Sequence, residues 1–253
     1  MTPTIWTYLI VCPMVFLAGF VDAVGGGGGL ISLPAYLFAG LPAQSAVATN
    51  KLSSSIGTAA STARYLKNGC VDYKLAIPGI AAAVIGAQIG SRLALMVTSN
   101  VYKILLMVLV PLVGLYTIFK KDLQPRDPDS IPRWKQYLLV TFTTLVIGVY
   151  DGFYGPGTGT FLLLVYTGLC RMDLLKASGN MKLANLSSNI SALVVFLMNG
   201  VVMLPLGLTA SVFSIAGHYI GAGFAIRKGS KFVRIIIICV IALLFVKILT
   251  EIV

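Results

Sequence analysis

The sequence predicts an all-α polytopic membrane protein with two inverted-topology repeats, each a glycine-broken helical hairpin plus three transmembrane helices. Three observations predict this fold: the composition, a glycine and aspartate motif that occurs twice, and the charge of the loops. Hydrophobic residues make up 57% and charged residues 11% of the 253, and the mean hydropathy is +0.91. A water-soluble fold cannot bury that much apolar surface, so the chain is expected in a bilayer.

Apolar stretches follow one another in the same order in both halves of the chain. Those of the first half cover about residues 5–24, 27–41, 43–66, 75–97 and 101–119, and those of the second cover about 137–150, 157–169, 177–199, 204–226 and 232–253. The predicted organisation is a first repeat over 1–119, a cytoplasmic connector over 120–135 and a second repeat over 136–253. Together they form one membrane domain.

The doubled motif lies inside apolar stretches, where glycines and a carboxylate are costly. It reads GFVDAVGGGGG over residues 19–29 and GVYDGFYGPGTG over 148–159. Asp22 aligns with Asp151 at a shift of 129 residues (151 − 22), and Lys51 aligns with Lys182 at a shift of 131 (182 − 51). Because the similarity extends beyond the glycines, the chain is expected to hold two copies of one unit.

Length decides whether each glycine break interrupts one membrane span or reverses the chain. A single helix over residues 137–169 would be about 50 Å long, against about 30 Å of hydrocarbon. Two helical legs joined at the break fit better, and the second legs, at about 20 Å, are short enough to end inside the membrane as half-helices. Each motif is therefore predicted to form a hairpin.

The basic residues of the loops support the hairpins. If each broken segment crossed the membrane once, eight loop Lys and Arg residues between 64 and 135 would face six between 171 and 234, which gives no orientation. With hairpins, all fourteen lie on one face, as the retention of Lys and Arg in the cytoplasm requires. Each repeat then crosses the membrane an odd number of times. The second copy is therefore expected to be inverted, with both termini outside the cytoplasm.

Two lysines at matching positions lie too deep in their predicted helices to be surface charges. Helices this polar cannot face lipid, so their side chains must line a cavity or the interface between the halves. There, amides, hydroxyls and an ammonium group can replace water around a small anion. The alternative is that each lysine serves only as the counter-ion of an aspartate. The side chains predicted to bind substrate are Lys51, Lys182, Asn50, Thr49, Asn180 and Asn185.

The glycines are expected to supply the other half of this site. A half-helix beginning near Gly27 or Gly157 aims unpaired backbone N–H groups and the positive end of its dipole at the break. The alternative is that the glycines only permit close helix contacts and a bend. The glycines predicted to contact the anion are Gly26, Gly27, Gly28, Gly155 and Gly157. Close helix packing alone is the role expected of the matched pairs Gly86 with Gly90 and Gly217 with Gly221.

The two aspartates of the motif, Asp22 and Asp151, have three interpretations. They pair with the deep lysines, cap the N–H groups of the break, or carry protons for coupled transport; pairing or capping is favoured because buried ionic groups are commonly paired. For the only histidine, His218, a packing and hydrogen-bonding role is favoured over the alternative of a proton relay, and no metal site is predicted. No arrangement indicates catalysis or a cofactor. The net charge of +11 is attributed to cytoplasmic loops, not to nucleic-acid binding.

Two long segments resemble a known family. GFVDAVGGGGGLISLPAYLFAGLPAQSAVATNKLSSSIGTAASTARYLKNG is similar to the first signature of the TauE/SafE sulfite exporter family, also called the toluene sulfonate uptake permease family. NMKLANLSSNISALVVFLMNG is similar to the second. The resemblance implies an inner-membrane carrier of small organosulfur anions such as sulfite or sulfonates, commonly an exporter. The second copy departs from the polyglycine form, since Pro156 and Thr158 interrupt its glycines.

The expected function is that of a secondary transporter, not an enzyme. A small sulfur-containing anion would bind between the halves, and rocking of one half against the other would alternate access, with coupling to the proton motive force. The alternatives are an anion channel, which uses the same basic residues without alternating access, a carrier of small non-sulfur organic anions, and a structural or accessory subunit that binds no small anion. The expected partners are the substrate anion and the lipid bilayer, and a homodimer is one candidate assembly.

Overall fold

The computed structural model describes residues 3–97 and 131–252, with side chains described for 3–97 and 131–228. All secondary structure in these ranges is helical, which confirms the all-α prediction. The predicted stretch over 101–119 and most of the connector lie outside the described residues. The helices are α1 (Ile5–Gly25), α2 (Gly29–Phe38), α3 (Ala43–Lys67), α4 (Tyr73–Met96), α6 (Arg133–Phe153), α7 (Thr158–Gly168), α8 (Leu174–Met198) and α9 (Leu204–Ile252).

Five of the described helices are long and apolar enough to cross a membrane: α1, α4, α6, α8 and the Leu204–Lys228 part of α9. The protein is therefore a multi-pass membrane protein, as predicted. α2 and α7 have 10 and 11 residues, so each is only about 15 to 17 Å long. They follow α1 and α6 directly after the two glycine breaks. Their length is the one expected of half-helices.

The backbone of α9 is helical without interruption from Leu204 to Ile252. The sequence predicts two separate helices here, over 204–226 and 232–253. The five residues expected to separate them, RKGSK, contain no proline, so the ladder of backbone hydrogen bonds can continue through them.

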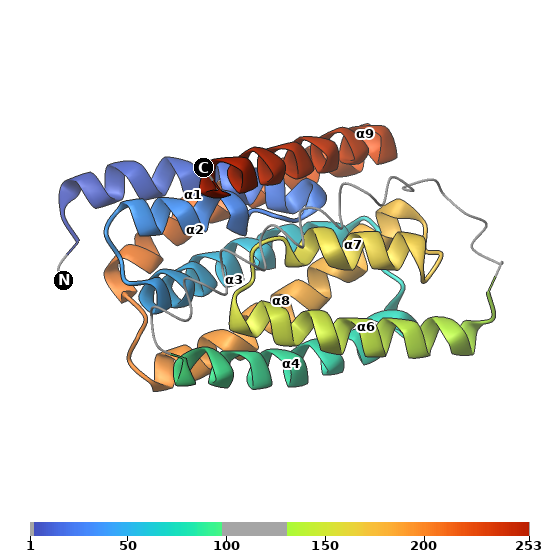
Figure 1. Ribbon diagram of the computed structural model, residues 1–253. Coiled ribbons are helices and arrows are strands. Elements are labelled where there is room, and N and C mark those ends of the chain that lie inside the picture. The colour runs from blue at the N-terminus through green and yellow to red at the C-terminus, as the bar shows by residue number, and fades with distance from the viewer. Residues whose placement is uncertain (1–2, 98–130, 253) are drawn as a thin grey trace.

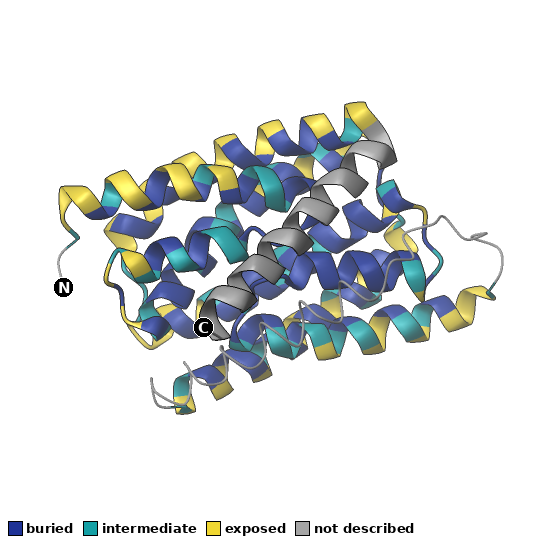
Figure 2. Ribbon diagram, turned by 45° about the horizontal axis from the view of Figure 1, so that its top comes forward, coloured by how far each residue is buried: buried dark blue, intermediate teal, exposed yellow. Residues whose placement is uncertain are grey.

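α3 has enough residues to cross a membrane, 25, but it is not among the apolar spans because it carries many polar side chains. Those side chains, including Thr49, Ser53 and Thr58, are buried against other helices. α8 is likewise rich in buried polar residues. Figure 2 shows the buried residues in the middle of the molecule and the exposed ones along its outer helices. α3 and α8 thus bring polar groups into the interior, away from lipid.

The first helices of the two copies, α1 and α6, run in opposite directions. In Figure 1, α1 leads from the N-terminus at the left toward the right, whereas α6 runs from right to left. α3 ends, and α4, α6 and α8 begin, at the right-hand end of the same view. Basic residues gather at that end because they occupy these helix termini: Arg64, Lys67, Lys74, Arg133 and Lys176. Gathering on one face is what the hairpin prediction expects.

α4 and α9 each pack closely against a helix of the other copy. A Cβ atom added to Gly90 of α4 would overlap the Val149 carbonyl group of α6, and one added to Gly221 of α9 would overlap the Phe20 carbonyl group of α1. Gly86 and Gly217 make equivalent contacts one turn earlier. The close-packing role predicted for these two glycine pairs is confirmed.

The packing divides the described helices into two groups that do not follow the sequence halves. α9 packs mainly on α1 and α3, whereas α4 packs mainly on α6 and α8. We call α1, α2, α3 and α9 the first body, and α4, α6, α7 and α8 the second body. The two bodies meet mainly where α3 contacts α8.

Candidate functional site

The two glycine breaks touch each other between the two bodies. Gly26 has a φ of 73°, a conformation that L side chains rarely adopt, and a Cβ on it would overlap the backbone of Gly159. A Cβ on Gly159 would in turn lie 2.7 Å from the Gly26 Cα. The Thr160 hydroxyl donates a hydrogen bond to the Gly25 carbonyl at 3.1 Å. Glycine is therefore required at this contact, because the two backbones pack directly against each other. Close packing of this kind is the role predicted as the alternative to anion binding.

Two buried ion pairs cross from one sequence copy to the other. Lys51 Nζ on α3 lies 2.7 Å from Asp151 Oδ2 at the end of α6, and Lys182 Nζ on α8 lies 2.6 Å from Asp22 Oδ2 at the end of α1. Each pair also joins the first body to the second. Each aspartate of the motif is thus the ion-pair partner of a deep lysine.

The Lys51 pair belongs to a network of neutral polar side chains from α8. Lys51 Nζ also donates to Asn189 Oδ1 at 2.8 Å, and the Ser188 hydroxyl donates to Asp151 Oδ2 at 2.6 Å. Asn189 Nδ2 in turn donates to Asn185 Oδ1 at 3.2 Å. Lys51 and Asp151 are only 2% and 1% exposed, so water stabilises their charges little. The ion pair and these hydrogen bonds therefore have to offset most of the free energy lost when the two charges leave water.

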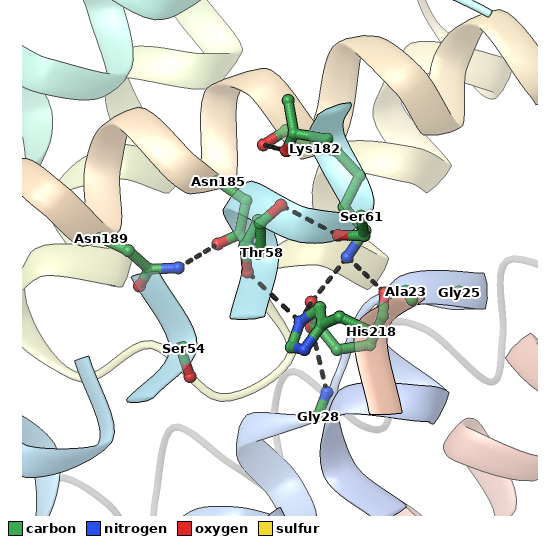
Figure 3. A network of polar contacts seen from close by, with 12 residues as sticks. Ala23, Gly25, Gly28, Ser54, Thr58, Ser61, Lys182, Asn185, Asn189 and His218 are labelled. Atoms are coloured by element: carbon green, nitrogen blue, oxygen red, sulfur yellow. Dashed lines mark hydrogen bonds and ion pairs between the residues drawn. The ribbon is translucent and has the colours of Figure 1, made fainter. Parts of the chain in front are cut away.

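The Lys182 pair has different partners. Lys182 Nζ also donates to the Asp22 backbone carbonyl, and Asp22 Oδ1 accepts from the Gly28 N–H at 3.2 Å, so Asp22 caps the break as well as pairing. His218 Nε2 lies 3.2 Å from Asp22 Oδ2. Figure 3 shows Lys182 and His218 approaching this position from different helices, close to Gly28.

A narrow cavity of about 20 Å³ opens between the two ion pairs, which is room for about one water molecule. A sulfite-sized anion is larger than this space, so the cavity has to widen before such an anion can enter. Of the two lysines, only Lys51 reaches the cavity wall. The lining residues are Asp22, Gly27, Gly29, Asn50, Lys51, Ser54, Asp151, Gly155, Gly157, Thr158, Gly159, Asn185 and Asn189.

Some residues predicted to bind substrate are not in the lining: Lys182, Thr49, Asn180, Gly26 and Gly28. Thr49 Oγ1 instead accepts from the Met203 N–H at 3.0 Å near the start of α9, and Asn180 Nδ2 donates to the Lys176 carbonyl at 2.9 Å. The physical reason is helical phase. Thr49 precedes Lys51 by two positions and Asn180 precedes Asn185 by five, which turns their side chains about 200° and about 140° away from these lining residues around the helix axis.

Several lining residues were not among the predicted site residues, and helical spacing could have found them. Ser54 follows Lys51 by three positions, and Asn189 follows Asn185 by four, so each shares a helix face with a lining residue that was predicted. Figure 3 shows Asn185 and Asn189 on α8 opposite Ser54 and Thr58 on α3. Among residues with described side chains, no cluster of three His, Cys, Asp or Glu could hold a metal ion.

The arrangement can bind a small anion once Lys51 is released from Asp151. Lys51 would then offer an ammonium group, while amide and hydroxyl groups of the lining would offer further donors. α2 and α7 both begin at the cavity, and the positive end of a helix dipole favours negative charge. Some of the first N–H groups already have partners, since those of Leu30 and Thr158 donate to the Gly27 and Gly155 carbonyls. The site is therefore suited to a small oxyanion held by donors from both bodies.

Comparison with known proteins agrees with this architecture. The family model described as "Sulfite exporter TauE/SafE" matches residues 11–248. A probable membrane transporter protein, ORF9, from Sinorhizobium sp is 34% identical over 93% of this chain and 90% of its own length. The probable membrane transporter protein YfcA from Escherichia coli K12 is 33% identical over 94% and 88%, and one from Haemophilus influenzae is 32% identical over 87% and 85%. No solved structure matches the chain. Family model, relatives and apolar helices together show that the chain belongs to the TauE/SafE family of membrane transporters.

Proposed function

We propose that this protein is a secondary transporter that moves small organosulfur anions, such as sulfite or a sulfonate, out across the inner membrane. The observation that carries the proposal is Lys51: a buried ammonium group on the wall of a cavity that two helix N-termini also reach. The description of the family supports sulfite and export. The basic ends of the helices face the cytoplasm in this proposal, and the N-terminus lies on the opposite side.

Anion binding exchanges one partner of Lys51 for another. In the closed arrangement Asp151 neutralises the lysine at 2.7 Å, so an arriving anion has to displace this carboxylate. The displaced Asp151 keeps the Ser188 hydroxyl, which donates at 2.6 Å. Since the ion pair joins the two bodies, its opening loosens the contact that holds them together. Anion binding is in this way linked to the separation of the bodies.

Alternating access in this proposal moves the first body against the second, not one sequence half against the other. The two copies act as inverted repeats whose α4 and α9 have exchanged places, because each packs on the other copy. Both ion pairs and the Gly26–Gly159 contact cross the boundary between the bodies. The hydrogen bond from Gln88 Nε2 on α4 to the Ser191 carbonyl on α8, at 3.1 Å, lies within the second body.

A crosslink between cysteines at Gln88 and Ser191 tests which groups move. These residues lie in different sequence halves but in the same body, so a thiol-reactive crosslinker in a background without the four native cysteines should leave transport active. The uncrosslinked double variant is the matched control. Loss of transport on crosslinking alone would show that the sequence halves move against each other.

Substrate class is tested by thermal stabilisation of the purified protein with sulfite, sulfate, thiosulfate, sulfonates and carboxylates. A ligand at a hundred times its dissociation constant stabilises the folded state by about 2.7 kcal/mol. Stabilisation by sulfite or sulfonates, and not by carboxylates, supports the proposal. Stabilisation by carboxylates alone would point to a carrier of non-sulfur organic anions.

A further inference from the structure

His218 is the only histidine of the chain, and it is 2% exposed at the contact between α9, α1 and α3. Its Nδ1 atom lies 2.9 Å from the Ser214 carbonyl oxygen on its own helix. Its Nε2 atom lies 3.2 Å from Asp22 Oδ2 on α1 and 3.3 Å from Thr58 Oγ1 on α3. Figure 3 shows the ring of His218 placed between Thr58 and the break at Gly28. Both ring nitrogens therefore have fixed partners.

The partners of the ring determine where its protons are. Nδ1 has two contacts with Ser214, the carbonyl oxygen at 2.9 Å and the hydroxyl at 3.3 Å. The carbonyl oxygen only accepts hydrogen bonds and is the nearer of the two, so we assign the hydrogen of the neutral ring to Nδ1. A neutral imidazole has a single N–H, so its Nε2 is then an acceptor that faces Asp22 Oδ2, which is also an acceptor when ionised. The Thr58 hydroxyl can donate to Nε2, but this places no hydrogen between Nε2 and Asp22 Oδ2. The contact at 3.2 Å becomes a hydrogen bond only if one additional proton lies on it.

We propose that Asp22 Oδ2 and His218 Nε2 together bind the coupling proton of the transport cycle, an inference that rests on the proposed transport function. The proton comes from water on one side of the membrane and leaves to water on the other, and no covalent bond between heavy atoms changes. The groups that face His218 are Asp22 from α1, Lys182 from α8 through the shared Oδ2, and Thr58 from α3, which does not titrate.

The charge of this cluster links the proton to the anion. Without the proton, Lys182, Asp22 and neutral His218 sum to zero; with it, they sum to one positive charge. Asp22 also lines the cavity that holds Lys51, so the added charge lies beside the anion site. Binding of the proton and of the anion therefore favour each other. A dianion with one proton moves one net negative charge outward, a direction that an inside-negative membrane potential favours.

Asp151, the aspartate of the second break, has no histidine in the equivalent place. At the shift of 131 residues that relates the deep lysines, the position of His218 corresponds to Ala87 (218 − 131). Asp151 receives its second hydrogen bond from the Ser188 hydroxyl, a neutral donor that needs no additional proton. The two aspartates, which the sequence treats alike, thus have different roles: Asp22 binds the proton and Asp151 competes with the anion.

Because the chain has one histidine, labelling with 15N-histidine gives an NMR spectrum of this site alone. In lipid we expect a ring with both nitrogens protonated in the wild-type protein, and in Asp22→Asn a neutral ring protonated at Nδ1 only. The Lys51→Met/Asp151→Asn double variant is the matched control and should keep the wild-type spectrum. A neutral ring in the wild-type protein, or an imidazolium that persists in Asp22→Asn, would overturn the proposal.

A transport measurement separates this inference from the proposed function. In proteoliposomes with a pH-sensitive dye inside, His218→Gln should abolish the proton movement that accompanies sulfite flux. Glutamine keeps a donor for Asp22, so the variant retains a partner at this contact. Proton movement that persists in this variant would overturn the proton site while leaving the transporter in place. Absence of any sulfite flux in the wild-type protein would instead refute the proposed function, and the NMR result would still stand for the proton.

Discussion

Removing one partner of the Lys51–Asp151 pair should damage the protein more than removing both. The pair is almost fully buried, and breaking a buried ion pair costs about 3–5 kcal/mol because it leaves an unpaired charge, whereas replacing both partners by neutral groups is often close to neutral. In Lys51→Met, Asp151 keeps only the Ser188 donor among its described contacts. In Asp151→Asn, the new amide oxygen can still accept from Lys51, so this variant should lose less.

The assay is a double-mutant cycle of unfolding in detergent–lipid micelles, combined with sulfite flux in proteoliposomes. We expect a loss of about 3–5 kcal/mol in Lys51→Met and recovery of most of it in Lys51→Met/Asp151→Asn. Transport should be absent from both, because neither retains the ammonium group on the cavity wall. The reasoning is refuted if Lys51→Met changes stability by less than about 0.5 kcal/mol, or if the stable double variant transports sulfite normally.

Two further predictions concern residues around the site. Gly26→Ala should abolish folding or transport, because its Cβ overlaps Gly159. The control Gly40→Ala has a similar φ of 87° but nothing within 4 Å of its Cβ, so its free energy of unfolding should fall by only about 1–2 kcal/mol. Equal losses of stability in thermal unfolding of the two variants would contradict this. Thr49→Val removes the acceptor of the Met203 N–H and should lower the free energy of unfolding by about 0.5–2 kcal/mol. The KM for substrate should be unchanged. A raised KM would indicate that Thr49 binds substrate.

Much of the architecture follows from the sequence because placing polar and charged groups inside a membrane costs free energy. Inside an apolar membrane stretch, a broken helix or a charged side chain costs free energy unless the protein satisfies its polar groups. The breaks at Gly27 and Gly157 and the burial of Lys51 could therefore be predicted. The half-helix lengths followed from the same stretches. Helical phase was also present in the sequence, and it would have excluded Thr49.

The crossed pairing could not be predicted. For each aspartate the sequence offers one lysine in the same copy and an equivalent lysine in the other copy. Residue types alone do not show which of the two lysines is its ion-pair partner. In the structure, Lys51 on α3 lies beside Asp151 on α6 where α8 packs on both helices. For His218 the sequence favoured packing over a proton relay, because a lone histidine is typical of packing until the contacts of both its nitrogens are known.

Counterflow of radiolabelled sulfite tests the transporter proposal most directly. Proteoliposomes with the wild-type protein are loaded with unlabelled sulfite and diluted into a trace of labelled sulfite, with the Lys51→Met/Asp151→Asn variant as control. A carrier with alternating access should accumulate label transiently above the outside concentration, and the variant should not. Equilibration of label without an overshoot, or an equal overshoot in the variant, would contradict alternating access at Lys51.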